Sequence, residues 1–267
     1  MTTQDEVTIA TYPATRGARW LQEAFAMFSR ARLQWLVLLV VYYATMLLVN
    51  TIPLIGQLAV PILKPVFAVG FLAAAWTQER GGKPQLGQLF RGFKSNLFAL
   101  LPLGVVLLVG ATIAVFATAL VDGGKLLDVI SGRAKLDEDA VSDGSMEAAM
   151  LFGALCALPV LLALWYAPAL VVFHDCTATR AIKLSLRATM SNWRPLALYA
   201  LLVGFYGVVV PGIVATLLAL ALPASIAPGL AVIVTMPYVL FLAATLHISD
   251  YVSYREIFHA DETVGAK

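Results

Sequence analysis

The stretch that decides the fold runs from Trp193 to Leu222 and reads WRPLALYALLVGFYGVVVPGIVATLLALAL. After a short turn it is followed by a second apolar run, from Pro228 to Tyr251. Arg194 is the single charged residue of the first run. About 20 apolar residues in a helix cross the roughly 30 Å hydrocarbon layer of a bilayer. The two runs therefore predict a pair of membrane-spanning helices joined by a tight turn.

Four further apolar runs precede this pair. They cover Leu33 to Val49, Pro53 to Thr77, Leu97 to Val121, and Met146 to Phe173. Of the 267 residues, 60% are hydrophobic and 13% are charged, whereas roughly 25% are charged in an ordinary soluble domain. A soluble all-α protein of this length could not bury six such runs. We predict a single all-α membrane domain over residues 1–267, a polytopic bundle of six transmembrane helices arranged as three hairpins.

The basic residues predict the orientation of these helices. Lys and Arg gather before the first run and after the second, fourth and sixth runs, while the loop 122–146 is acidic. Basic loops stay on the cytoplasmic side of a membrane. We therefore expect a bacterial inner-membrane protein with both termini in the cytoplasm, a disordered tail over 1–13, an extracytoplasmic acidic loop over 122–146 and a cytoplasmic tail over 255–267.

Each hairpin is preceded by a basic segment with helical periodicity. These segments cover residues 14–32, 84–96 and 177–192, and in the first of them Trp20, Ala24 and Phe28 share one face. This pattern predicts amphipathic helices at the membrane surface, with basic side chains on anionic lipid. Packing of the same helices against the bundle is the alternative. The residues predicted to form a lipid or partner surface are Arg16, Arg19, Arg91, Lys94, Arg180, Lys183 and Arg187.

A short motif supports a threefold internal repeat. Arg91 to Asn96 and Arg187 to Asn192 share the spacing R-x-x-x-S-N immediately before the third and fifth runs. Ser and Asn accept hydrogen bonds from free amide groups at helix starts, so both are predicted to be caps. Pro65, Pro168 and Pro237 lie in the second, fourth and sixth runs. We expect these prolines to bend their helices.

Lys64 is a basic residue in the middle of the second run. An ammonium group in hydrocarbon costs a few kcal/mol, so Lys64 is expected to face the bundle interior or water. One interpretation is an intramembrane substrate or proton site. In two others the helix breaks at Pro61 or Pro65 so that the lysine reaches the interface, or the ammonium binds a carbonyl that a proline has freed.

Two polar clusters stand at the ends of the fourth and sixth runs. His174, Asp175 and Cys176 follow the fourth run, while His247 and Asp250 lie near the end of the sixth. Their residue types suit a metal, but the spacing matches no zinc pattern, so no metal or cofactor is expected. The sequence also lacks a phosphate-binding loop, an H-E-x-x-H motif and a G-x-S-x-G motif. A third, unfavoured possibility is an enzyme that acts on lipid through His174, Asp175, His247 or Asp250.

Several segments resemble a family of uncharacterised bacterial integral membrane proteins. The resemblance lies in Ala167 to Leu170, Ala181 to Ser185 with Asn192 and Trp193, and Tyr251 to Phe258. It extends to Ile52 to Gly56 at the first hairpin and to Pro65 and Gly70. The layout is also similar to the membrane domain joined to some glycerophosphodiester phosphodiesterases, although no catalytic domain is present. The resemblance implies an inner-membrane bundle and assigns no functional residue.

The favoured function is therefore non-enzymatic: a membrane protein that organises lipid or serves as an accessory subunit of a membrane complex. Expected partners are anionic lipid headgroups, and a membrane protein complex or a second copy of the chain. The net charge of +2 gives no reason to expect nucleic acid. The alternative is a transporter or channel for a small solute or lipid, built on Lys64 and proline-kinked helices.

Overall fold

The computed structural model describes residues 7–94, 96–134 and 144–259, and all regular elements in these ranges are helices. Six helical segments of the described chain are long and apolar enough to cross a membrane, which confirms the predicted fold class. They are α2 (Arg32–Asn50), α3 (Ile55–Glu79), α6 (Leu97–Asp122), α9 (Ser145–Leu164) with α10 (Ala167–Phe173), α12 (Trp193–Gly204) with η1 (Phe205–Val209) and α13 (Val210–Ala221), and α14 (Ala227–Phe258).

Two of the six spans are not continuous α-helices. The fourth is interrupted at Trp165 and Tyr166, and Pro168 lies in the first turn of α10, where its missing amide hydrogen costs nothing. The fifth contains the π-helical segment η1. Pro65 and Pro237, in contrast, lie inside the unbroken helices α3 and α14. Of the three prolines that were predicted to bend their helices, only Pro168 lies where its helical span is interrupted.

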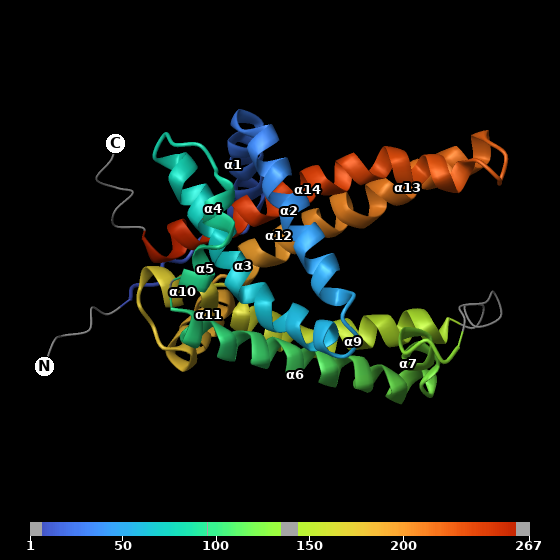
Figure 1. The fold of residues 1–267 in the computed structure, drawn as a ribbon, viewed down its shortest axis with the longest axis horizontal. Coiled ribbons are helices and arrows are strands. Elements are labelled where there is room, and N and C mark those ends of the chain that lie inside the picture. Colours follow the sequence, from blue (N-terminus) through green and yellow to red (C-terminus); the bar gives the residue numbers. More distant parts are fainter. Residues whose placement is uncertain (1–6, 95, 135–143, 260–267) are drawn as a thin grey trace, which may run out of the picture.

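The spans form three hairpins that diverge from one end of the molecule (Figure 1). Within the hairpins α2 packs on α3, α6 on α9 and α13 on α14. Helix α3 also contacts α6 and α14, so it is central to the arrangement. The hairpin of α13 and α14 and the hairpin of α6 and α9 extend to the same side of the molecule and lie apart from each other (Figure 1).

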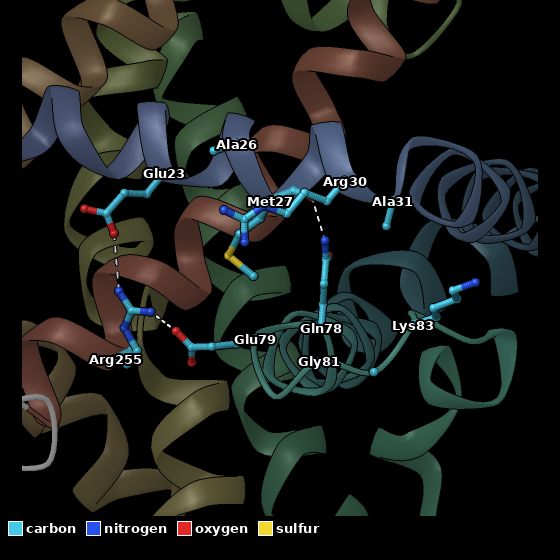
Figure 2. Close-up of a pocket in the computed structure, with 11 residues that line it drawn as sticks. Glu23, Ala26, Met27, Arg30, Ala31, Gln78, Glu79, Gly81, Lys83 and Arg255 are labelled. Atoms are coloured by element: carbon cyan, nitrogen blue, oxygen red, sulfur yellow. Dashed lines mark hydrogen bonds and ion pairs between the residues drawn. The ribbon is translucent and has the colours of Figure 1, made fainter. Parts of the chain in front are cut away.

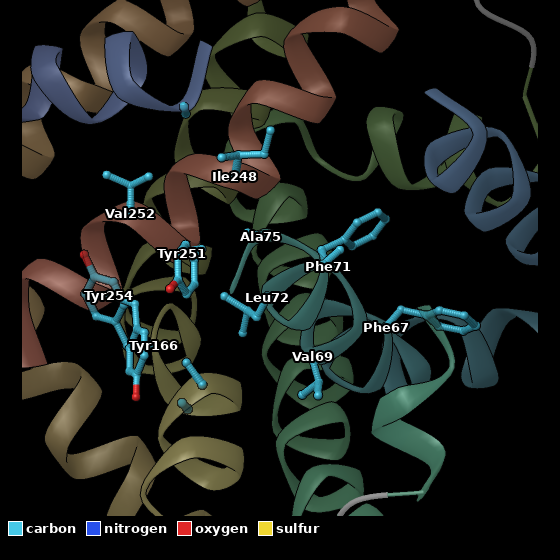
Figure 3. Packing of buried hydrophobic residues seen from close by; sticks show 14 of the residues in the cluster. Phe67, Val69, Phe71, Leu72, Ala75, Tyr166, Ile248, Tyr251, Val252 and Tyr254 are labelled. Atoms are coloured by element: carbon cyan, nitrogen blue, oxygen red, sulfur yellow. The ribbon is translucent and has the colours of Figure 1, made fainter. Parts of the chain in front are cut away.

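The buried core lies at the end from which the hairpins diverge, which we call the base. The base consists of α1 (Arg16–Arg30), α4 (Leu86–Leu89), α5 (Arg91–Lys94), α10, α11 (Ala178–Ser191) and the adjoining ends of α3 and α14. Figure 3 shows Leu72 of α3 turned toward Tyr166 and, from α14, Tyr251, while Phe71 lies on the other side of α3. In the fifth span, by contrast, none of the 18 residues of its most apolar stretch is buried. Hydrocarbon solvates apolar side chains as well as another helix does, so burial concentrates in the base.

The apolar face of α1 is buried in the protein. Trp20, Ala24 and Phe28 are almost completely inaccessible, and α1 packs against α12 and α14. Helix α11 likewise buries Ala181 and Ala188. The prediction that these faces enter the headgroup region is therefore wrong, and the alternative of packing on the bundle describes both helices. The segment 84–96 forms two one-turn helices, α4 and α5, in place of one.

Two glycines allow α4 and α5 to approach α3. A Cβ atom on Gly92 of α5 would lie 2.1 Å from the carbonyl oxygen of Val66. A Cβ atom on Gly70 of α3 would lie 2.4 Å from the carbonyl oxygen of Leu89. Both distances are far inside van der Waals contact, and the atoms met belong to the backbone. Close docking of the segment after α3 therefore requires glycine at both positions.

The asparagines of the repeated motif stand at the N-cap positions of α6 and α12, as predicted, but neither side chain makes a capping hydrogen bond to its helix. Asn192 is completely buried, its Oδ1 accepts a hydrogen bond from the amide of Tyr12 (3.0 Å), and its Nδ2 donates to the carbonyl of Ala10 (2.9 Å). Asn96 donates instead to the carbonyl of Val171 (3.2 Å) and to Asp175 (3.0 Å). Buried backbone groups need such partners. The motif therefore joins chain segments at the base.

Parts of both predicted tails are held on the bundle. The amide of Ala10 donates to the carbonyl of Ile257 (2.9 Å), so the described part of the N-terminal segment is held on the bundle, contrary to the prediction of a disordered tail over 1–13. Helix α14 continues through Phe258 because Ile257 and Phe258 are buried in the core. Residues 1–6, 260–267 and 135–143 of the acidic loop lie outside the described residues.

Replacing Gly92 with alanine should destabilise the protein by about 1–3 kcal/mol, because the new methyl group meets the backbone of α3. The matched control is Gly87→Ala in α4, where a Cβ atom has no other atom within 4 Å. Thermal unfolding of both variants in mild detergent measures the difference. Equal melting temperatures for Gly92→Ala and Gly87→Ala would show that the close contact is absent.

Candidate functional site

An ion-pair network joins α1 to the end of α14. The guanidinium of Arg16 pairs with Glu256 and, at 2.7 Å, with Glu23. The indole nitrogen of Trp20 donates to the same Glu256 carboxylate (2.5 Å). Glu256 is 9% exposed, and removing one member of a part-buried pair leaves the other charge without compensation. This network therefore fixes α1 on α14.

The surroundings of Arg16 keep it charged. The hydrogen bond to Glu256 raises the pKa of Arg16 above its ordinary value, and the nearby charge of Glu23 acts in the same direction. Tyr12, which donates its hydroxyl to the carbonyl of Glu256 (3.1 Å), has its pKa raised by burial. The tyrosine is therefore a neutral hydrogen-bond donor at physiological pH.

A second network joins α14 to α1 and α3. Arg255 pairs with Glu79 of α3 and with Glu23 of α1 (3.3 Å), and the hydroxyl of Tyr251 donates to Glu79 (2.5 Å). Figure 2 shows Arg255 between the two carboxylates. Glu23 thus belongs to both networks. Together they connect the first hairpin unit, through α1 and α3, to the third, through α14.

These residues form one wall of an open pocket of about 520 Å³. Arg30 and Gln78 lie further along it, and Lys83 lies at the far side from Arg255 (Figure 2). The amide of Gln78 donates to the carbonyl of Met27 (2.6 Å), which holds α3 against α1. Within the described residues, neither Arg30 nor Lys83 makes an ion pair. The pocket has the size of a ligand site and carries uncompensated positive charge.

The predicted surface residues fall into three groups. Arg16 faces inward and is paired, so its assignment to a lipid surface is wrong. Arg180 is half-buried. The remaining five are exposed around the base: Arg19, Arg91, Lys94, Lys183 and Arg187. The structure places them on α1, α5 and α11, and it does not gather them into one pocket.

Lys64 is exposed on the side of α3, so of the two expected environments, bundle interior or water, it does not occupy the buried one. It lies in the interior of the unbroken α3, so no helix break at Pro61 or Pro65 places it there. Lys64 makes no hydrogen bond or ion pair with any other described residue. It does lie within electrostatic range of His247 and Asp250 of α14.

His247 and Asp250 face a small internal cavity between α3, α10 and α14. Its volume is about 30 Å³, room for about two water molecules. The ring of His247 stacks on Phe71 with 4.0 Å between centroids. The indole nitrogen of Trp165 at the cavity is buried and has no hydrogen-bond partner among the described residues. The cavity combines this indole donor with the polar side chains of His247 and Asp250, and a polar cavity of this size is a site for ordered water.

The second polar cluster does not join the first. His174 contacts the rings of Tyr254 and His259, with 4.9 Å between the two imidazole centroids. Burial raises the pKa of the Cys176 thiol, so this cysteine is a weak metal ligand. Within the described ranges, no group of three or more His, Cys, Asp or Glu side chains is arranged to hold a metal ion.

Sequence reasoning missed the acidic members of the networks, Glu23, Glu79 and Glu256. One indication was available: Arg255 and Glu256 stand side by side among residues of a core helix, between Val252 and Ile257. Charged residues within an otherwise apolar helix require partners. The identity of those partners depends on tertiary contacts between segments more than 170 residues apart.

A comparison with known proteins decides the family. A protein of Burkholderia thailandensis, named as a probable inner membrane protein, is 31% identical over 261 residues, which cover 95% of each chain. This chain belongs to that family. No protein-family model matches it, and no solved structure does. The likeness to the membrane domain of glycerophosphodiester phosphodiesterases receives no support from these comparisons. Family membership and the six apolar helices together establish an integral inner-membrane protein.

Replacing Glu256 with glutamine should destabilise the protein by about 3 kcal/mol, because Arg16 loses its nearest counter-charge while the side-chain shape is kept. The control is Glu147→Gln, an exposed acid in the first turn of α9. Chemical unfolding in detergent, followed by the fluorescence of Trp20 and the other tryptophans, gives the two stabilities. A Glu256→Gln protein as stable as its control would contradict the role assigned to this network.

Proposed function

We propose that this protein gathers anionic phospholipid around its base, which we place in the cytoplasmic leaflet. It acts without catalysis, as an organiser of lipid or as the lipid-bound subunit of a larger membrane assembly. The observation that carries this proposal is the division of charge within the base. Acidic side chains there are turned toward internal partners, whereas basic side chains are turned outward.

The acidic residues of the base are occupied. Glu23, Glu79 and Glu256 pair with arginines, and Asp175 accepts a hydrogen bond from Asn96. Many basic side chains in the base and at the helix ends next to it are exposed and, within the described residues, have no ion pair. They are Arg19, Arg30, Arg32, Arg80, Lys83, Arg91, Lys94, Lys183, Arg187 and Arg194. The outer surface of the base is therefore cationic even though the whole chain is nearly neutral.

Aromatic side chains support a position of this surface at the membrane boundary. The guanidinium of Arg80 lies 4.2 Å from the ring centre of Trp76, and that of Arg194 lies 5.5 Å from the ring centre of Trp193. Trp193 is 60% exposed at the start of the fifth span. Tryptophan is enriched at the headgroup level of membranes, where its amphipathic ring is stable. Basic residues beside it are well placed to meet phosphate groups.

The double variant Lys183→Gln, Arg187→Gln should bind phosphatidylglycerol roughly thirty-fold more weakly, since each basic side chain contributes about 1 kcal/mol near an anionic surface. The control removes two basic residues from the opposite end of the molecule, Lys125→Gln and Arg133→Gln. Native mass spectrometry of both proteins over a phosphatidylglycerol titration gives the affinities. Equal affinities would refute the proposal, as would a uniform preference for phosphatidylethanolamine.

Transport is a second candidate, favoured by the water-sized cavity at His247 and Asp250 and by the charge of Lys64 nearby. If the protein conducts protons, liposomes containing it should dissipate an imposed pH gradient, and Asp250→Asn should abolish the flux because it removes the cavity carboxyl group. Asp122→Asn is the control, since that carboxylate accepts hydrogen bonds from the amides of Gly124 and Leu126 far from the cavity. Gradient decay equal to that of empty liposomes would remove this candidate.

A further inference from the structure

An apolar groove of about 320 Å³ runs between α1 and the third hairpin. Leu21 and Phe25 line it from α1, Tyr206 from η1, and Tyr238, Phe241 and Leu242 from α14. The ring of Phe25 meets that of Phe241 edge-on, with 5.3 Å between centroids. No charged side chain belongs to the described lining. The volume lies at the lower end of the range found for ligand pockets.

The π-helical segment forms part of the groove wall. A π-turn widens a helix and displaces its backbone hydrogen bonds, and such turns occur frequently at functional sites. Here the hydroxyl of Tyr238 donates to the carbonyl of Tyr206 across the hairpin (2.7 Å). This bond ties the wall of α14 to η1. Tyr206 remains 44% exposed beside the groove.

The depth of the groove can be estimated from α14. Tyr238 and Leu242 follow the start of that helix at Ala227 by roughly 17 and 23 Å, at 1.5 Å per residue, within a hydrocarbon layer of roughly 30 Å. The groove therefore lies inside the membrane, in the half that adjoins the base. Its other wall, α1, carries the polar residues Gln22 and Arg19 one turn apart on an exposed face.

We propose that this groove holds one acyl chain of an anionic phospholipid, whose headgroup binds Arg19 and Gln22 on α1. The preference for an anionic headgroup rests on the proposed function. The groove adds a defined binding site for one lipid molecule. Two features select this occupant over a second copy of the chain. The groove lies at acyl-chain depth, and its lining residue Gln22 stands one helical turn from Arg19, a cation without an ion pair in the described structure, which complements a phosphate group.

The test uses the full chain in nanodiscs with a phosphatidylglycerol analogue that carries a photoreactive group in its acyl chain. Crosslinked peptides are then mapped by mass spectrometry. Labelling should concentrate on the segments of Tyr206 and of Tyr238 to Leu242. Leu242→Trp, which fills the groove, should lower this labelling at least five-fold. Leu220→Trp is the matched control, since Leu220 is 80% exposed on α13 outside the groove.

Two further experiments distinguish the possible outcomes. Thermal unfolding confirms that Leu242→Trp is folded, and Arg19→Gln gives a second variant that leaves the groove intact. Arg19→Gln should lower labelling by the phosphatidylglycerol analogue and leave labelling by a phosphatidylethanolamine analogue unchanged. Groove labelling equal to that of α13, or unaffected by Leu242→Trp, overturns the inference, and so do crosslinks from the groove to a second copy. If one of these contradicting results appears while the double variant Lys183→Gln, Arg187→Gln still binds phosphatidylglycerol more weakly, the acyl-chain site is refuted. The proposed function is then still supported.

Discussion

The arrangement of this protein depends on the carboxylate of Glu256, which lies between the guanidinium of Arg16 and the indole of Trp20. Through Glu23 this contact continues to Arg255 and from there to Glu79 of α3. The network is part-buried, so its members cannot exchange their partners for water without cost. It joins α1 and α3 of the first hairpin unit to α14 of the third at one end of the molecule. No comparable ion pair connects the hairpins further along the described helices.

The position of this network explains where the core lies. Apolar helices in lipid gain little by packing on one another, because hydrocarbon solvates their side chains equally well. The third hairpin therefore extends with most of its surface exposed, and the buried aromatic residues collect in the base around Trp20, Tyr166 and Tyr254. Because the acids of the base are used internally, its outer surface is left with basic side chains. The same interactions that stabilise the fold thus create the cationic surface on which the proposed lipid binding depends.

Much of this architecture could be predicted from the sequence, since hydropathy locates membrane spans with little ambiguity. The six runs correspond to the observed helices within a few residues, except that α14 extends further because its last turns enter the core. The glycine contacts at Gly70 and Gly92 and the role of Asn192 could not be predicted. Each depends on backbone atoms of a distant segment, and periodicity within a segment carries no information about such partners. Arg16 shows the same limit: its position in a basic segment suggested a free surface, while Glu256, 240 residues later, decides its partner.

The measurement that tests the central claim most directly is the lipid composition around the native protein. The chain would be extracted with its surrounding bilayer by a styrene–maleic acid copolymer, and its lipids would be compared with those of the whole membrane. The account predicts enrichment of phosphatidylglycerol or another anionic lipid, which decreases when the ionic strength of the extraction buffer is raised. A lipid composition equal to that of the whole membrane at low ionic strength would contradict the claim that the outward-facing basic residues of the base gather anionic lipid.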